Sequence, residues 1–373
     1  MDNHTSTHNA LKVVMLKFPH LAEKILQKVD NQGLAKSREV DQFWQIFIDE
    51  RDYPWLRIVN IPTVLPNENT YSHIAAEHGQ IDAFEMILNE DNNADPKDDW
   101  GVTPYLIACG KGRMNIVSML MKKSKELSVD LNKRDNGCRT AFHLACEEGH
   151  SDIAKMIMKN SSKLKIDLNT KDIGGRTAFH VVCSLGHTEI AEIMIKNSAK
   201  LKIDFSTKDN RDSTGFHLAC HRGHYEIAKM ILENSPRLKM DLNGRNIVGY
   251  TGFQEVILKG YLNIAEMIID HSLGLEINLN TTCNEGMTVF HLACSGRQSE
   301  NRTRIVEMVL EISKSHKIDL TAIEKLGQTG YQMAEYFKRT EVINLIKTKM
   351  PSLVVFGLGH TKPLEALAYQ NYD

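Results

Sequence analysis

The chain has 373 residues, and its 45 Lys and Arg residues against 47 Asp and Glu residues give a formal net charge of −2. This near neutrality excludes a strong field that would draw the chain to nucleic acid or to an acidic membrane surface. A hydrophobic content of 42% and a charged content of 25% are typical of a soluble folded protein, and no apolar run approaches the roughly 18 residues of a membrane helix. The polar start of the chain and an odd cysteine count of 7 favour a cytoplasmic or nuclear protein with free thiols.

After a segment formed by residues 1–17, residues 18–58 predict three short helices. Leu21, Ile25 and Val29 lie four residues apart on one face, and a second apolar stripe begins at Val40. A module of roughly 40 residues is near the lower limit for independent folding, and it exposes large aromatic side chains. Either a partner protein covers these side chains or they pack on the first repeat of the following array.

Short patterns occur in order along this module: Phe18-Pro19, Ile25-Leu26, Val29-Asp30, Leu34, Val40 to Trp44, and Pro54 to Ile58. In order and spacing they resemble an F-box, although Phe18 replaces the family's Leu and Asp41 its Cys. The resemblance implies docking on a Skp-type adaptor, which joins F-box proteins to a cullin ubiquitin ligase. The implied adaptor-binding residues are Pro19, Leu21, Ile25, Leu26, Val29, Leu34, Val40, Phe43, Trp44, Trp55 and Leu56.

A linker, residues 59–66, leads to a long internal repeat. Similar segments, such as the one from Thr140 to Cys146, recur with a period of 37 residues. They begin at Thr103, Thr140, Thr177, Thr214, Thr251 and Thr288. An earlier copy at Thr70 and a later one at Thr329 give eight copies over residues 67–349, followed by a tail, residues 350–373.

Each copy predicts two short antiparallel helices. A turn precedes the threonine, and Cys138 and Asp212 stand where other copies have glycine. The first helix ends near Gly149, and the polar stretch 159–163 is expected to end the second, which places the extra residues of the long period in a loop. Because neither helix buries its apolar face alone, the copies must stack into a solenoid.

The order Thr-x-Phe-His, Leu-Ala-Cys, Gly-His, an apolar helix and Asp-Leu-Asn resembles the ankyrin repeat over about three quarters of the chain. The family's proline is kept only at Pro104, and its usual period of 33 residues appears once. In this family the Thr-x-x-His pair bonds the turn of its own or the next repeat. The resemblance therefore implies that His143, His180, His217 and His291 are structural.

The ankyrin resemblance also implies a substrate-binding surface at the turn tips and at the exposed end of each first helix. Its mixed charges identify no particular ligand. The implied residues are Trp100, Arg139, Glu147, Glu148, Arg176, Leu185, Arg211, His221, Arg222, Tyr250, Leu258, Lys259 and Met287.

Two other patterns suggest metal or phosphate binding, but the repeat accounts for both. The spacing His143-x-x-Cys146 places two possible zinc ligands on one helix face, but two ligands leave a zinc site short, and a buried cysteine behaves as a small hydrophobe. Lysine pairs such as Lys163 and Lys165 could bind phosphate, but Asp167 follows them, so a solvated loop edge is expected. No metal or cofactor is therefore predicted.

No nucleophile with an independent base and no glycine-rich phosphate loop occurs, so the chain is predicted not to be an enzyme. The overall prediction is an all-α protein in which a small three-helix F-box-like module precedes an ankyrin-repeat solenoid of about eight repeats. Its predicted function is to recruit a substrate protein as the non-catalytic subunit of a Skp/cullin-type ubiquitin ligase. Apart from that complex, the protein is predicted to be monomeric. The alternative is an ankyrin scaffold or inhibitor without a ubiquitin role, and a weaker third reading is a metal- or nucleic-acid-binding repeat protein.

Overall fold

The computed structural model describes residues 71–91, 93–296 and 299–358. In these ranges the named elements are all helices, with one isolated bridge between Ile323 and Thr329. The chain divides into two units, of which the first ends at Ile173 and the second begins at Gly174. The F-box-like module, 18–58, and the linker that follows it lie outside the described residues.

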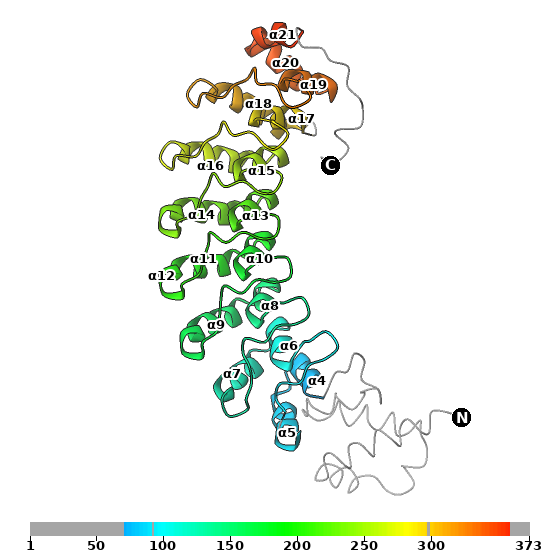
Figure 1. Ribbon diagram of the computed structural model, residues 1–373, viewed down its shortest axis with the longest axis vertical. Helices are drawn as coiled ribbons and strands as arrows, with labels where there is room; N and C mark the ends of the chain where they lie inside the picture. Colours follow the sequence, from blue (N-terminus) through cyan, green and yellow to red (C-terminus); the bar gives the residue numbers. More distant parts are fainter. Residues whose placement is uncertain (1–70, 92, 297–298, 359–373) are drawn as a thin grey trace, which may run out of the picture. The chain divides into compact units, whose positions relative to one another are not determined.

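The first unit is built from stacked helix pairs. Its described pairs are α4 (Tyr71–His78) with α5 (Ile81–Asp91), α6 (Pro104–Gly110) with α7 (Met114–Lys123), and α8 (Ala141–Glu147) with α9 (Ser151–Leu164). Figure 1 shows the first helices α6 and α8 in one layer and the second helices α7 and α9 in another. Each helix contacts its own partner and its counterpart in the next pair, which is the packing that a stacked repeat requires.

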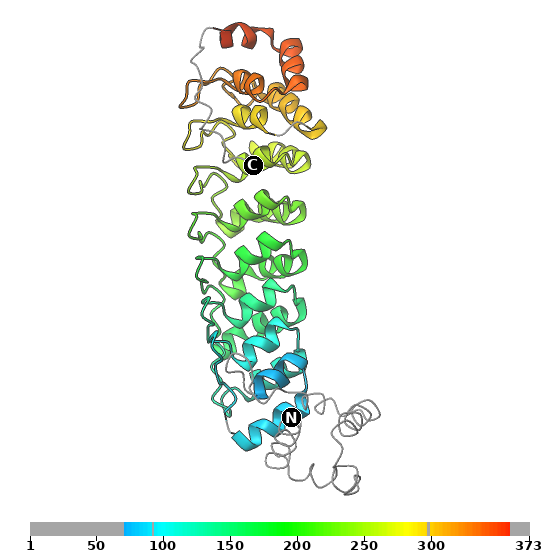
Figure 2. The ribbon, with the colours of Figure 1, turned by 90° about the vertical axis from the view of Figure 1, so that its right-hand side faces the viewer.

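The second unit continues the same pattern. Its described pairs are α10 (Ala178–Leu185) with α11 (Thr188–Lys196) and the short α12 (Ser198–Leu201), α13 (Gly215–Arg222) with α14 (Tyr225–Leu238), α15 (Gly252–Lys259) with α16 (Leu262–Ser272), α17 (Val289–Ser295) with α18 (Glu300–Ile312), and α19 (Gly330–Tyr336) with α20 (Thr340–Lys349). A last helix, α21 (Pro351–Leu358), contacts α19 and α20, so the start of the predicted tail caps the last pair. Figure 2 shows the connecting loops along one edge of the helices.

Two of the second helices, α9 and α14, are longer than the sequence predicts. The stretch 159–163 was expected to end α9, but this helix continues to Leu164, and Lys165 ends it in the left-handed conformation with φ of 54°. The apolar stripe of α9 begins with Ile153 and Ile157 and extends to Leu164. Packing of Leu164 therefore stabilises one more turn at the end of this helix. In α9 and α14, which have 14 residues each, the extra residues of the long period therefore lengthen the helix instead of its loop.

Phenylalanines at one repeat position form the centre of each unit. Phe142 in the first unit and Phe179, Phe216, Phe253 and Phe290 in the second are at most 2% exposed. The Phe179 and Phe216 rings press on the first residue of the next first helix, which is glycine in both cases. A Cβ on Gly215 or Gly252 would lie 2.5 Å from the ring of Phe179 or Phe216, respectively. Close packing of the rings therefore selects glycine at these two helix starts.

A buried Thr–His pair begins α8, α10, α13 and α17, and in the last three the histidine also bonds the next repeat. In α13 the Thr214 N–H donates to His217 Nδ1 at 3.2 Å, so the proton of the neutral ring sits on Nε2. Nε2 then donates to the Gly244 carbonyl in the next turn at 2.9 Å. His180 and His291 bond carbonyls of the following repeat as well, those of Ser213 at 3.1 Å and Gln328 at 3.0 Å, which confirms the predicted structural role of these histidines.

Two copies have glutamine in place of this histidine, and Gln254 keeps both bonds. Gln254 Oε1 accepts from the Thr251 N–H at 3.1 Å, and its Nε2 donates to the Thr281 carbonyl at 2.9 Å. Gln332 accepts from the Thr329 N–H at 2.9 Å in the same way. The position therefore needs an acceptor and a donor on opposite ends of one planar group, and it does not need a titratable side chain.

A second link joins the end of one first helix to the next pair. The residue before α9 and the residue before α14 donate to last-turn carbonyls of the first helix of the preceding pair: His150 to Gly110 at 3.0 Å, and His224 to Ser184 at 3.1 Å. Arg302 does the same for Ile257 and Leu258, and burial lowers the pKa of its guanidinium to about 10. A donor at this place satisfies carbonyls that have no partner within their own helix.

We expect His217→Ala to destabilise the protein by about 2 kcal/mol, because it leaves the buried Gly244 carbonyl without its donor and removes half of the Thr214 cap. His217→Gln should lose less than about half of that, since Gln254 makes both bonds at the equivalent position. Thermal unfolding of the full chain followed by circular dichroism checks this. Equal losses for the two variants would contradict the proposed donor and acceptor roles.

The same histidines predict a dependence of stability on pH. Burial lowers the pKa of His73, His217 and His291 below the ordinary value for histidine. The unfolded chain therefore binds more protons below about pH 6.5, and stability that is fully present above this pH is lost as pH falls towards the folded pKa values. Melting temperatures between pH 7.5 and 5.5 should fall, and His217→Gln with His291→Gln should flatten the dependence. An unchanged slope in this double variant would show that other groups cause it.

Candidate protein-interaction surface

The turns before the first helices are fixed in one conformation. In the first turn the Gly101 N–H donates to the Asp98 carbonyl at 2.9 Å, and the Asp98 side chain accepts from the backbone of Trp100 and Val102. The fourth residue is left-handed in each turn, including Cys138 with φ of 60° and Asp212 with φ of 56°. These two residues therefore occupy the glycine position, as the sequence predicts. The second and third residues form the tip of each turn.

Backbone hydrogen bonds join neighbouring tips into a row within each unit. In the first unit the Asn136 N–H donates to the Trp100 carbonyl at 2.8 Å, and the Ile173 N–H donates to the Gly137 carbonyl at 2.9 Å. The second unit repeats this bond four times: from Asn210 to Gly174, Ile247 to Arg211, Asn284 to Val248, and Lys325 to Glu285. A row held in this way presents its side chains with little loss of conformational entropy on binding.

The predicted tip residues differ in their availability. Trp100 is 61% exposed, and Arg176 and Arg211 are also exposed. Arg139 is half-buried because it forms ion pairs with Asp135 at 2.8 Å and with Glu147 at 2.9 Å. Trp100 and Arg211 are thus the tip residues best placed to contact a partner, while Arg139 ties its turn to α8.

Two residues of the predicted surface are buried, which corrects their assignment. Tyr250 is 4% exposed and Met287 is 1% exposed. Both follow the left-handed residue of the turn, and the carbonyls of Tyr250 and Met287 accept from the N–H of the first turn residue. Arg176 is exposed at the same position, so the apolar character of Tyr250 and Met287 decides that they pack inwards. The residue before the left-handed position points outwards instead, so Val248 and Glu285 take their places on the surface.

The structure adds apolar tip residues that the sequence reading missed. Ile173 is 73% exposed, and Ile247, Val248 and Leu326 are between 42% and 58% exposed. Each lies one or two residues before the left-handed glycine of its turn, so the spacing to that glycine was the available signal. Exposed apolar side chains on a rigid row are typical of protein-binding surfaces.

The ends of the first helices form a second row in the second unit. Leu185 ends α10 and is 49% exposed, Arg222 ends α13 and is exposed, and Lys259 ends α15 and is exposed, while Leu258 is half-buried. His221 Nδ1 lies 2.8 Å from Glu255 Oε2, and this buried carboxylate also accepts from Asn246 at 2.9 Å. In the first unit, Glu147 pairs with Arg139 and Glu148 is exposed.

The predicted adaptor-binding residues, Pro19 to Leu56, lie outside the described residues.

In the described ranges the cysteines at the repeat position are buried, and burial raises the pKa of each thiol. They are Cys109, Cys146, Cys183, Cys220 and Cys294. A buried neutral thiol is a poor nucleophile and a poor metal ligand. In the same ranges no group of three or more His, Cys, Asp or Glu side chains is arranged to hold a metal ion. Every helix described is too short or too polar to span a bilayer.

Comparison with protein families identifies this architecture. Residues 72–172 and 162–243 match the model described as ankyrin repeats, 3 copies, and no enzyme family was found. Comparison with the curated proteins found no match. Ankyrin repeats are generally non-catalytic modules of protein interaction. Residues 72–243 of this chain are therefore ankyrin repeats, and the chain contains a protein-interaction module.

Proposed function

We propose that this chain is a non-catalytic recognition subunit that binds a substrate protein along its turn tips and first-helix ends. The observation that carries the proposal is the row of tips joined by backbone hydrogen bonds, which holds Arg211, Ile247 and Val248 exposed and in fixed order. Arginine and large apolar side chains are the types that most often anchor protein interfaces. The repeat array that presents them extends, in this proposal, over eight copies from residue 67 to residue 349.

Arg211 and Arg222 provide the contact test. Both are exposed, and neither forms an ion pair with a described residue, so their substitution leaves the scaffold bonds intact. The full chain with Arg211→Ala and Arg222→Ala should bind a partner recovered by affinity purification at least about tenfold more weakly, since truncating a buried interface anchor costs about 2 kcal/mol. Surface plasmon resonance measures this.

The matched control for this pair is Lys200→Ala with Lys239→Ala, which removes two exposed charges that follow the second helices of the same unit. Unchanged binding of the arginine variant, or an equal loss in the lysine control, would count against the assigned surface.

The second part of the proposal concerns the F-box-like module, residues 18–58. Its order of apolar and aromatic residues, from Pro19 to Trp55, supports docking on a Skp-type adaptor and through it on a cullin ligase. Docking module and repeats then have separate roles: the first joins the ligase, and the second presents the substrate for ubiquitin transfer. A repeat scaffold or inhibitor is the competing function, and the two differ in whether the adaptor binds.

Adaptor binding is tested on the full chain with Phe43→Ala and Trp44→Ala. Purified Skp-type adaptor should form a complex with the parent chain in size-exclusion chromatography, and the double variant should lose it, because aromatic anchors dominate such interfaces. The melting temperature of the repeats should remain within about 2 °C, an expectation based on additivity of distant sites. Absence of any complex with the parent chain would favour the scaffold function.

A further inference from the structure

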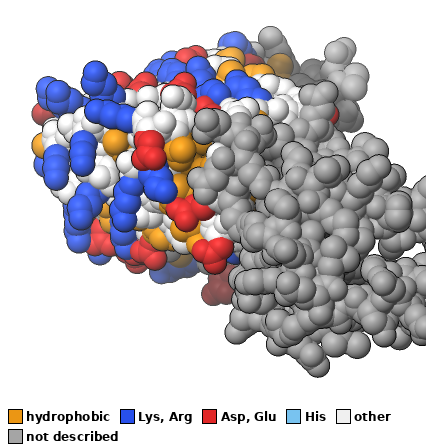
Figure 3. Space-filling view, turned by 90° about the horizontal axis from the view of Figure 1, so that it is seen from below, with side chains coloured by type: hydrophobic (Ala, Val, Ile, Leu, Met, Phe, Trp, Pro, Cys, Tyr) orange, Lys and Arg blue, Asp and Glu red, His pale blue; other side chains and the backbone are white. Residues whose placement is uncertain are grey.

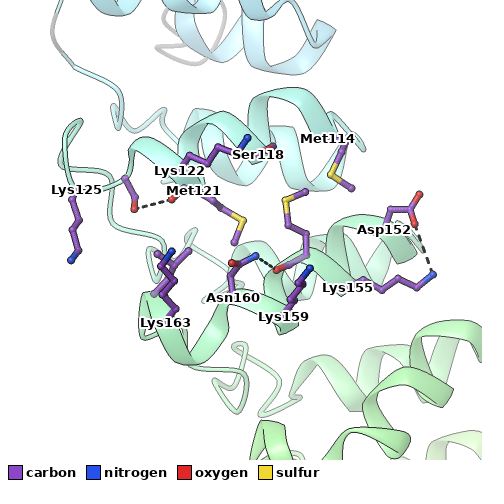
Figure 4. Close-up of a pocket in the computed structure, with 13 residues that line it drawn as sticks. Met114, Ser118, Met121, Lys122, Lys125, Asp152, Lys155, Lys159, Asn160 and Lys163 are labelled. Atoms are coloured by element: carbon purple, nitrogen blue, oxygen red, sulfur yellow. Dashed lines mark hydrogen bonds and ion pairs between the residues drawn. The ribbon is translucent and has the colours of Figure 1, made fainter.

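The outer side of the first unit, formed by its second helices, contains a groove of about 760 Å³ between α7 and α9. Figure 4 shows Met114 and Asp152 towards one end of this groove and Lys125 and Lys163 towards the other, so the groove follows both helices. It exists in this length because α9 continues to Leu164. A helix of 14 residues spans about 21 Å, which is enough for three to four turns of a docked helix.

The groove has a soft apolar floor. Met114, Met121 and Met156 line it with Leu164. Met121 is 4% exposed, while the other three are half-buried and accessible. Methionine side chains are flexible and polarizable, and they occur in surfaces that accept the apolar face of a helix.

Lysines surround this floor. The groove is lined by Lys122, Lys125, Lys155, Lys159 and Lys163, and its one acidic residue is Asp152. Asp152 lies 3.8 Å from Lys155, whereas the other four lysines form no ion pair with a described residue. Figure 3 shows Lys and Arg side chains gathered over the side of the molecule on which the second helices lie. The groove therefore carries uncompensated positive charge next to an apolar surface.

The second unit shows that stacking does not need this charge. The equivalent residues of α11 and α14, 74 positions later, are Glu192, Lys196, Glu226, Lys229, Glu233 and Arg237, which sum to zero charge. There Lys196 pairs with Glu192, and Arg237 donates to the Ile195 carbonyl of α11 at 3.0 Å. One fold position thus takes Lys159 in the first unit and Glu233 in the second, so the positive charge of the first groove has no structural cause.

We propose that the α7–α9 groove binds an acidic amphipathic helix of a partner protein, with apolar residues on the methionine floor and Asp or Glu side chains against the lysines. The commitment to a helix rests on charge complementarity combined with the floor, because a nucleic acid or a lipid headgroup would use the lysines but leave the apolar floor uncovered. The groove lies on the second-helix side, so it adds a second partner to the surface proposed above and does not depend on it.

The test uses the full chain and two fluorescein-labelled synthetic peptides of identical composition. In one, Leu recurs at positions i, i+3, i+4 and i+7 with Glu on the opposite face; in the other, the order is scrambled. Fluorescence anisotropy should give a dissociation constant in the micromolar range for the amphipathic peptide and binding at least about tenfold weaker for the scrambled one. Binding should weaken as salt is raised from about 0.05 to 0.3 M, because the lysines are exposed.

Variants locate the site. Lys159→Glu copies the residue found at the equivalent position 233, so it should fold, and it should weaken peptide binding at least about tenfold. Met156→Gln should weaken it about fivefold through the floor. The control, Lys196→Gln with Lys229→Gln, removes the same net charge of two from the α11–α14 groove and should change binding less than about twofold. Circular dichroism melting curves verify that each variant is folded.

Three results would overturn the proposal. The first is equal binding of the scrambled peptide, and the second is equal weakening by Lys159→Glu and by the control pair. The third is that the amphipathic peptide fails to bind, whereas heparin or phosphatidylserine vesicles bind and Lys159→Glu abolishes their binding. That result would assign the groove to a polyanion or a membrane surface.

Discussion

The buried hydrogen bonds from α10, α13, α15 and α17 to the following turns are the interactions on which the remaining structure depends. His217 accepts from the Thr214 backbone and donates to the Gly244 carbonyl, and Gln254 does the same one repeat later. Both partners are buried, where an unpaired polar group is expensive. The bond therefore fixes the start of one helix and the position of the following turn together, and the row of turn tips results from that coupling.

Scaffold positions and recognition positions are separate in this protein. The phenylalanines, the Thr–His or Thr–Gln pairs and the donors to first-helix carbonyls occupy buried or half-buried positions in most described copies, so the tip residues are left to vary. They range from Trp100 through Arg211 to Val248 without any change in backbone geometry. The same separation applies to the second helices, where Lys159 and Glu233 occupy one position of the repeat. Differences between copies are thus more informative about binding than the features they share.

The period and the two helices of each copy could be predicted from the sequence, because similar apolar spacing recurs from copy to copy. The structural role of the histidines was implied by the resemblance to ankyrin repeats. The sequence also showed that Cys138 and Asp212 stand where other copies have a turn glycine, and the structure gives both a left-handed conformation. The reading was wrong for the end of α9, because lysines at 159 and 163 look like a solvated loop although Leu164 continues the apolar stripe. It was also wrong for Tyr250 and Met287, because these apolar side chains pack inwards at a position where Arg176 is exposed.

By itself the sequence determined the helical class, the copy-to-copy spacing and the interaction character of the repeats, since these depend on periodic local patterns that stacking reinforces. It also contains the F-box-like order of residues 18–58, whose docking role is a proposal. Only the tertiary structure decided which side chains are available. Exposure of Val248 beside buried Tyr250, and the meeting of lysines from α7 and α9 over a methionine floor, depend on how segments 37 residues apart pack together. No local pattern contains that information, because a contact surface belongs to neighbouring repeats and not to one.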